Sequence, residues 1–162
     1  MAKVKQHKVI SRLSTTAFKR GGISAAQALK AAEATLDALR PPCLEDLDAA
    51  LDVLDKRFGR DSVGSCKGSN SDVYLLGSKI IDSAIGLPGS GVDQAARALC
   101  EFVDQAEQWC VQDWAVVGIH VDCLKLLRAT GATMSSVQLN AVLEGLAQLA
   151  RKRLSEVAVT AP

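Results

Sequence analysis

The chain contains few aromatic residues: two Trp, three Phe and one Tyr among 162 residues. Ala and Leu dominate its apolar residues instead, and this composition favours helices over sheets. No apolar run approaches the length of a membrane span, and the N-terminus lacks the apolar core of a signal peptide. The length of the chain is sufficient for one domain with a full core, and 48% of its residues are hydrophobic. We therefore expect a cytoplasmic protein with no membrane span.

The cysteines are odd in number and lack paired spacing. A disulfide framework or a zinc site needs cysteines in pairs, so neither is expected. Two of them, Cys100 and Cys123, are flanked by apolar residues and are predicted to be reduced core residues. Cys66 lies in a Gly/Ser-rich loop and is predicted to be the exposed thiol. No metal or other cofactor is expected. The five cysteines are Cys43, Cys66, Cys100, Cys110 and Cys123.

The first 30 residues contain no Asp or Glu, although they carry seven Lys and Arg residues. Residues 1–22 are therefore predicted to form a basic arm, with a short amphipathic helix over residues 4–18. An acidic protein, a nucleic acid or an anionic lipid surface would attract such an arm. A solvated arm that covers an acidic body is the favoured interpretation. We expect no nucleic-acid partner, because the chain has no zinc finger and no RNA-binding aromatic motif.

Two helices are predicted in the first third of the chain. Ser24 and Gln27 have capping-box spacing and open the first helix. Pro41-Pro42 is predicted to end it, because proline cannot donate the next backbone hydrogen bond. A second helix is predicted from Pro42 to Phe58, with leucines at steps of three and four residues. Asp48, Asp52 and Asp55 share one side of this helix, which indicates a solvated surface rather than a cation site.

Four further helices are predicted after a loop at residues 59–70. Apolar residues recur at helical spacing in each of them, and the loops between them are short. We therefore expect an all-α protein: an antiparallel up-down four-helix bundle with one or two additional N-terminal helices. A single domain would span residues 23–156, followed by a tail at 157–162. The predicted helices cover residues 71–85, 92–108, 112–130 and 135–156.

The third helix contains the segment Leu76-Gly-Ser-Lys79-Ile-Ile-Asp-Ser-Ala-Ile-Gly86. Its spacing resembles the signature of histidine phosphotransfer (HPt) domains, which reads His-x-x-Lys-Gly and, after five further residues, Gly. Lys79 and Gly86 match this signature, whereas Leu76 stands at the histidine position and Ile80 at the first glycine. The similarity in architecture extends over roughly residues 24–155, with an HPt-like core at about 71–155. The apolar pattern also resembles bacterial HPt-like proteins associated with chemotaxis, in which the histidine is often missing.

The resemblance implies a signalling adaptor that cannot transfer phosphate. Phosphotransfer requires an exposed imidazole nitrogen, and Leu76 has none. A receiver domain or a histidine kinase would instead dock on the surface around Leu76, Lys79, Ile80 and Gly86. Lys79 would face the acidic pocket of a receiver domain. The expected protein is therefore not an enzyme.

Three alternatives remain open at the level of sequence. His120 follows Val117 by three residues and shares its apolar face, so it is predicted to be a hydrogen-bonded core histidine; the alternative is a relocated phosphorylation site. The very apolar third helix or the leucines of residues 44–58 could instead form a homodimer, which would make the chain a scaffold without a role in phosphotransfer. A small enzyme is least favoured, because no convergent polar cluster appears on the helical faces.

Overall fold

The structure, a computed structural model, describes residues 24–62, 69–106 and 109–160. All regular secondary structure in these ranges is helical, which confirms the predicted all-α class. The described residues form five α-helices, labelled α2 to α6, and three short 3-10 helices. The up-down arrangement of the last four helices as a four-helix bundle stays a prediction.

The chain divides into two compact units, Met1–Ala38 and Leu39–Pro162. In the smaller unit, the described residues begin at Ser24 and continue into helix α2 (Ala25–Phe58). The Ser24 amide donates to Oε1 of Gln27 at 3.0 Å, and the Gln27 amide donates to Oγ of Ser24 at 3.2 Å. This reciprocal pair confirms the predicted capping box.

Pro41 and Pro42 do not end the first helix, contrary to the prediction. Helix α2 continues through both prolines, so the two helices predicted before residue 59 are one. The prolines remove two amide donors and crowd the carbonyls four residues earlier. The helix persists because Ala- and Leu-rich sequence flanks the prolines on both sides, and because its second half is anchored in the core. The boundary between the compact units falls just before the prolines, at Ala38.

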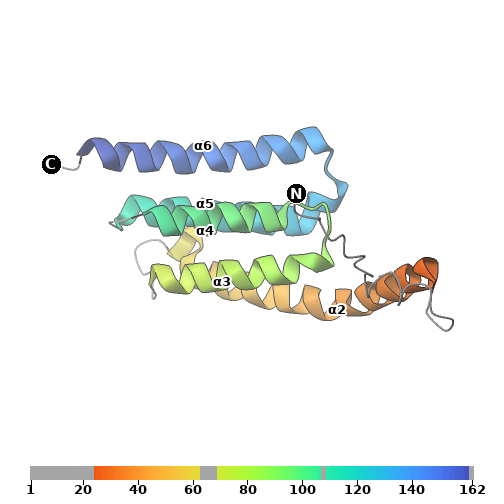
Figure 1. Cartoon of the computed structure of the whole chain (residues 1–162). Helices are drawn as coiled ribbons and strands as arrows, with labels where there is room; N and C mark the ends of the chain where they lie inside the picture. Colours follow the sequence, from red (N-terminus) through yellow and green to blue (C-terminus); the bar gives the residue numbers. More distant parts are fainter. Residues whose placement is uncertain (1–23, 63–68, 107–108, 161–162) are drawn as a thin grey trace, which may run out of the picture. The chain divides into compact units, whose positions relative to one another are not determined.

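The larger unit contains the second half of α2 and four further α-helices (Figure 1). Their starts agree with the predictions to within one residue. The last helix ends at Thr160 and therefore includes most of the predicted tail. The predicted division into residues 1–22, 23–156 and 157–162 otherwise stays untested, since residues 1–23 lie outside the described ranges. The four helices are α3 (Asn70–Ser83), α4 (Val92–Gln105), α5 (Val111–Thr130) and α6 (Ser136–Thr160).

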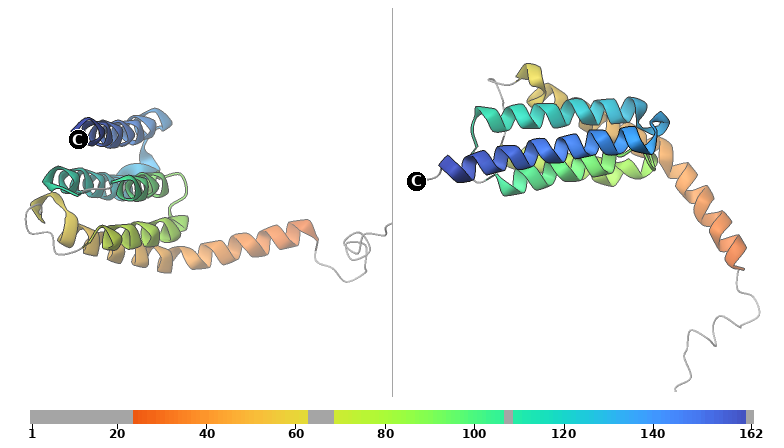
Figure 2. Two further views of the ribbon diagram at one scale, coloured as in Figure 1. Left: turned by 60° about the vertical axis from the view of Figure 1, so that its left-hand side comes forward. Right: turned by 90° about the horizontal axis from the view of Figure 1, so that it is seen from above.

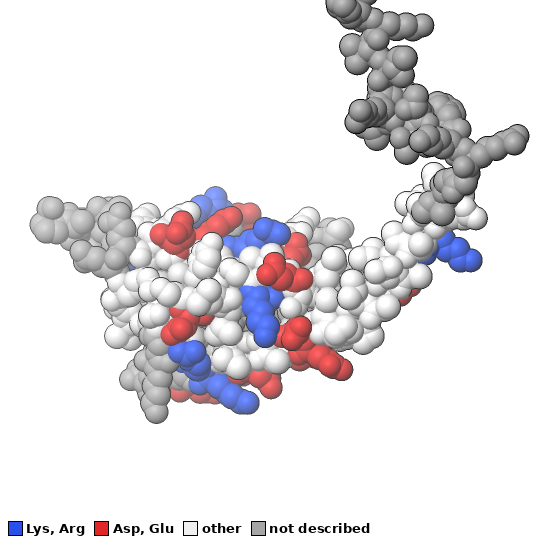
Figure 3. Space-filling view, turned by 60° about the horizontal axis from the view of Figure 1, so that its bottom comes forward, with Lys and Arg blue, Asp and Glu red and all other residues white. Residues whose placement is uncertain are grey.

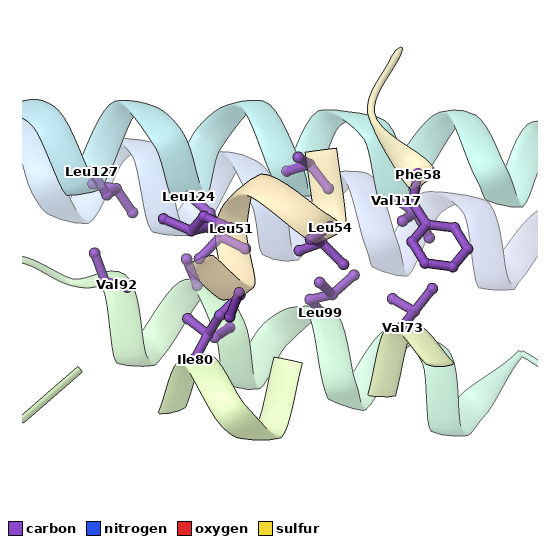
Figure 4. Close-up of a cluster of buried hydrophobic side chains, with 14 of the residues drawn as sticks. Leu51, Leu54, Phe58, Val73, Ile80, Val92, Leu99, Val117, Leu124 and Leu127 are labelled. Atoms are coloured by element: carbon purple, nitrogen blue, oxygen red, sulfur yellow. The ribbon is translucent and has the colours of Figure 1, made fainter. Parts of the chain in front are cut away.

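The core of the larger unit is built mainly from α2, α3, α4 and α5 (Figure 4). Five residues of α2 are buried there, and burying one large apolar side chain contributes roughly 1.5–3 kcal/mol relative to exposure. This burial explains why α2 stays attached beyond its prolines. The large buried side chains include Leu47, Leu51, Leu54, Phe58, Val73, Ile80, Val92, Leu99, Phe102, Val117, Val121, Leu124 and Leu127.

Helix α6 lies on the outside of the larger unit, against α4 and α5 (Figures 1 and 2). Leu146 is its only buried residue among those described. Other apolar residues of α6, such as Leu139, Val142 and Leu149, are partly buried against the core. The amide of Ser135 donates to Oε1 of Gln138 at 3.0 Å, which confirms the second predicted capping box.

Two glycines allow close approach around the predicted turn at residues 86–91. Gly91 has φ +76°, and a Cβ at this position would lie 2.5 Å from Cδ1 of Leu139 in α6. Gly131, after α5, lies so close to Ser90 that a Cβ would overlap the Ser90 carbonyl oxygen. The turn between α3 and α4 therefore contacts both the end of α5 and the beginning of α6.

Several predictions fall on residues that the structure does not describe. These are the basic arm at residues 1–22, the amphipathic helix at 4–18 and the exposed thiol of Cys66. Within the described ranges, no helix has the length and apolar character needed to cross a membrane. The cytoplasmic location stays a prediction.

Candidate functional site

Helix α3 begins with a capping arrangement that also ties it to α2. The Ser69 amide donates to Oδ2 of Asp72 at 3.0 Å, and Nη2 of Arg57 donates to the same oxygen at 2.8 Å. The hydrogen bond from the Ser69 amide, followed by the charge of Arg57, lowers the pKa of Asp72 below its ordinary value. The start of α3 is thereby fixed next to the end of α2.

The four residues predicted to form a docking surface do not share one exposed side of α3. Ile80 and Gly86 are buried, and Leu76 is partly buried against the core. Lys79 alone among them is exposed. A Cβ at Gly86 would lie 3.3 Å from the side chains of Cys43 and Leu44, so this glycine allows the segment directly after α3 to approach α2. Ile80 and Gly86 are therefore part of the packed interior and are not available to a docked partner.

The opposite side of α3 carries an exposed surface of mixed character. Tyr74, Leu75 and Ile85 are 44%, 66% and 59% exposed, and the exposed charged residues Lys79 and Asp82 lie between them in sequence. Leu75, Lys79 and Asp82 follow one another at steps of four and three residues, so they return to the same side of α3. We call Tyr74, Leu75, Lys79 and Asp82 of α3, together with Ile85 of the 3-10 helix that directly follows it (Ala84–Gly86), the outer face of α3. The sequence signalled it only as a helix that is apolar over most of its circumference.

A hollow of about 420 Å³ lies at one end of the outer face, between the start of α3 and the end of α4. Tyr74 and Leu75 form part of its wall, so the hollow adjoins the outer face. The carboxylate of Asp104 also lines it, at the C-terminal end of α4. The lining residues are Asn70, Ser71, Tyr74, Leu75, Val103, Asp104 and Ala106.

His120 lies in the core, as its apolar spacing predicted. Its side chain is 0% exposed, and its ring stacks on Phe102 with 6.1 Å between ring centroids. Nδ1 lies 2.9 Å from the Val116 carbonyl oxygen, which can only accept, so Nδ1 carries the proton. Nε2 has no hydrogen-bond partner in the described part of the chain. Burial lowers the pKa of His120 and favours the neutral ring, while the hydrogen bond to Val116 opposes this shift.

A second cluster, which the sequence analysis missed, joins α5 to α6. Nε of Arg153 lies 2.8 Å from Oδ1 of Asp113, and Nη2 of Arg153 lies 2.8 Å from Sγ of Cys110. The Cys110 amide donates to Oδ2 of Asp113 at 2.8 Å. Cys110 and Asp113 have capping-box spacing, with a thiol where Ser or Thr is usual. This spacing was the available signal, whereas the pairing with Arg153 depends on the tertiary fold.

Two carboxylates of α2 pair with basic residues of α5. Arg128 contacts Asp48 at 2.7 Å and Lys125 contacts Asp55 at 2.6 Å. Hydrogen bonds to these carboxylates raise the pKa of both basic groups. No group of three or more potential metal ligands occurs in the described ranges. On the side of the larger unit seen in Figure 3, acidic and basic side chains are interspersed with uncharged surface.

Comparison with known proteins identified no relative. No family model, no curated protein and no solved structure matches the chain.

Proposed function

We propose that the protein is a non-catalytic, HPt-like signalling adaptor that docks a receiver domain or a histidine kinase through the outer face of α3. One observation supports this proposal above the others. The outer face combines large exposed apolar side chains with Lys79, which forms no ion pair within the described residues. A surface of this kind is suited to a partly apolar partner that presents carboxylates.

Lys79 is the residue of the outer face that a receiver domain would recognise. By analogy with HPt domains, this lysine would lie next to the acidic pocket of the docked receiver. Leu75 lies one helical turn before Lys79 and is 66% exposed, so both can contact the same partner. The docking surface is thus shifted from the predicted Leu76 to its exposed neighbour Leu75.

The proposal assigns no phosphoryl transfer to the protein. Leu76 occupies the position of the phospho-accepting histidine and has no nitrogen to accept a phosphoryl group. His120 is enclosed by the core, so its imidazole lies out of reach of a docked receiver. Binding on the outer face would therefore compete with active phosphotransfer proteins or tether a response regulator.

Titration of the full chain with purified receiver domains and histidine kinases tests the proposal. Saturable binding in the micromolar range is expected, with Leu75→Asp and Lys79→Glu each weakening it about tenfold. Lys152→Glu is the matched control, because Lys152 is exposed on α6 and the exchange is the same. Its affinity should remain within about twofold of the unaltered chain.

Two outcomes would contradict the proposal. One is the absence of binding to every receiver domain and kinase by a chain whose circular dichroism shows it folded. The other is binding that is equally strong in Lys79→Glu, Leu75→Asp and Lys152→Glu, since the partner would then contact some other surface.

A further inference from the structure

The outer face of α3 carries two opposite charges that form no ion pair with any other described residue. Neither Lys79 nor Asp82 forms an ion pair in the part of the chain that the structure describes, although every charged residue of α5 does. Exposed Tyr74 and Ile85 stand at the two ends of the same face. A face with both charges and two apolar ends has the elements needed to pair with a copy of itself.

The spacing of these four residues fits one antiparallel register. When two copies of a helix pair about a two-fold axis perpendicular to the helices, residues equally distant from the axis lie opposite each other. The midpoint of Tyr74 and Ile85 falls between residues 79 and 80, and the midpoint of Lys79 and Asp82 between residues 80 and 81. These midpoints differ by one residue, or about 1.5 Å along the helix. A single axis therefore serves both pairs.

The order of these four residues along the outer face also fits the antiparallel register. Tyr74 lies near the start of α3 and Ile85 in the 3-10 helix that directly follows it, so these two apolar residues mark the two ends of the outer face. Lys79 and Asp82 lie between them on α3, one turn apart. An antiparallel two-fold arrangement places each side of one helix against the same side of its copy. Apolar residues then meet apolar residues, and each charge meets its opposite.

We propose that two copies of the chain associate through the outer faces of α3, packed antiparallel. Tyr74 lies against Ile85 of the second copy, and Lys79 pairs with Asp82 of the second copy, each contact occurring twice. This inference goes beyond the proposed function and does not depend on a signalling partner. Where both interactions occur they compete, because they use the same residues. The dimer would then cover the docking surface, and a signalling partner could bind only after the dimer dissociates.

Charge reversal on the full chain tests the proposal. The dimer dissociation constant, measured by sedimentation equilibrium over a range of protein concentrations, should rise about tenfold in Lys79→Glu and in Asp82→Lys. Each exchange replaces two symmetric attractions with two repulsions. The double variant Lys79→Glu/Asp82→Lys restores opposite charges and should return to within about twofold of the unaltered chain. Lys152→Glu should leave the constant unchanged.

Several results would overturn this inference. They are a chain that is monomeric at every concentration, a dimer that neither single exchange weakens, and a double variant no tighter than the single ones. Circular dichroism of each variant verifies that it is folded, which is expected for exchanges at exposed positions.

The same variants separate this inference from the proposed function. The double exchange restores self-association but not binding to a receiver domain, because the charges of the receiver are unchanged. A monomer that binds a receiver overturns the dimer alone, and a dimer that binds no receiver or kinase overturns the proposed function alone.

Discussion

Nε of Arg153 lies 2.8 Å from Oδ1 of Asp113, and this pair joins α6 to the first turn of α5. The two side chains are only 16% and 2% exposed. Burial acts to raise the pKa of Asp113, but hydrogen bonds from Arg153 and Cys110 outweigh it and hold the pKa below its ordinary value. Because Leu146 is the one described residue of α6 that is fully enclosed, this ion pair is a main attachment of the outer helix.

Replacing Asp113 with Asn should destabilise the protein substantially. The exchange leaves the Arg153 guanidinium without its carboxylate in a nearly buried position, and it weakens the cap of α5. We expect the free energy of unfolding, measured by urea denaturation, to fall by about 2–3 kcal/mol. Glu144→Gln breaks the exposed pair of Arg151 and Glu144 and should cost less than about 0.5 kcal/mol. Equal losses in the two variants would refute a special role for the buried pair.

The buried imidazole of His120 should make stability depend on pH. Burial lowers its pKa in the folded state below the ordinary value of 6.5, so the unfolded chain binds the proton more strongly. The free energy of unfolding should therefore decrease as the pH falls below about 6.5, by up to about 1.4 kcal/mol per pH unit until the folded pKa is reached. Urea denaturation at a series of pH values measures this slope.

His120→Phe should remove most of that slope, because the ring that titrates is gone. His7 lies outside the described residues, and His7→Phe is the matched control that keeps the buried imidazole. The control should retain the slope. If the slope disappeared in His7→Phe and persisted in His120→Phe, the pH dependence would come from His7, and the prediction for His120 would be wrong.

Two Gly→Ala exchanges, one before α6 and one within it, should change the free energy of unfolding in opposite directions. A Cβ at Gly131 would overlap the Ser90 carbonyl oxygen, so Gly131→Ala should lower the free energy of unfolding by more than about 1 kcal/mol. A Cβ at Gly145, within α6, meets nothing within 4 Å. Gly145→Ala should stabilise by about 0.5–1 kcal/mol through helix propensity. A neutral Gly131→Ala in thermal denaturation would show that the turn at Ser90 adapts freely.

The packing of α3 on α4 should appear as a coupling between Gly77 and Cys100. A Cβ at Gly77 would lie 2.7 Å from Sγ of Cys100, so Gly77→Ala should destabilise by about 1–3 kcal/mol. In a Cys100→Ala background the sulfur is absent, and the same exchange should be neutral or stabilising. Urea denaturation of both single variants and the double variant gives the coupling energy, which we expect to exceed about 1 kcal/mol. Additive effects would mean that the two helices separate to admit the methyl group.

Local signals predicted most helix starts but not the continuity of α2. The capping pairs of Ser24 with Gln27 and Ser135 with Gln138 depend on residues three positions apart, so the sequence identified both. Pro41-Pro42 is a strong local signal for a helix end. It was overridden by core burial of residues far along the chain, a contribution that local sequence does not reveal.

The candidate site was predicted only in part, and for a similar reason. The spacing of Leu76, Lys79 and Gly86 placed them on one helix, but it did not show which side of that helix faces the core. Because α3 is apolar around most of its circumference, helical periodicity could not orient it. The packing of its buried side against α2 and α4 left Leu75, Lys79 and Asp82 outside.

The sequence by itself determined that the described chain is helical, where most helices begin, that the imidazole of His120 shares an apolar face, and that Leu76 cannot accept a phosphoryl group. Each of these follows from side-chain chemistry or from residues within a few positions of one another. The tertiary structure alone decided the continuity of α2, the exposed side of α3 and the pairing of Asp113 with Arg153. Those features depend on contacts between residues tens of positions apart, whose free energies exceed the local preferences of the backbone.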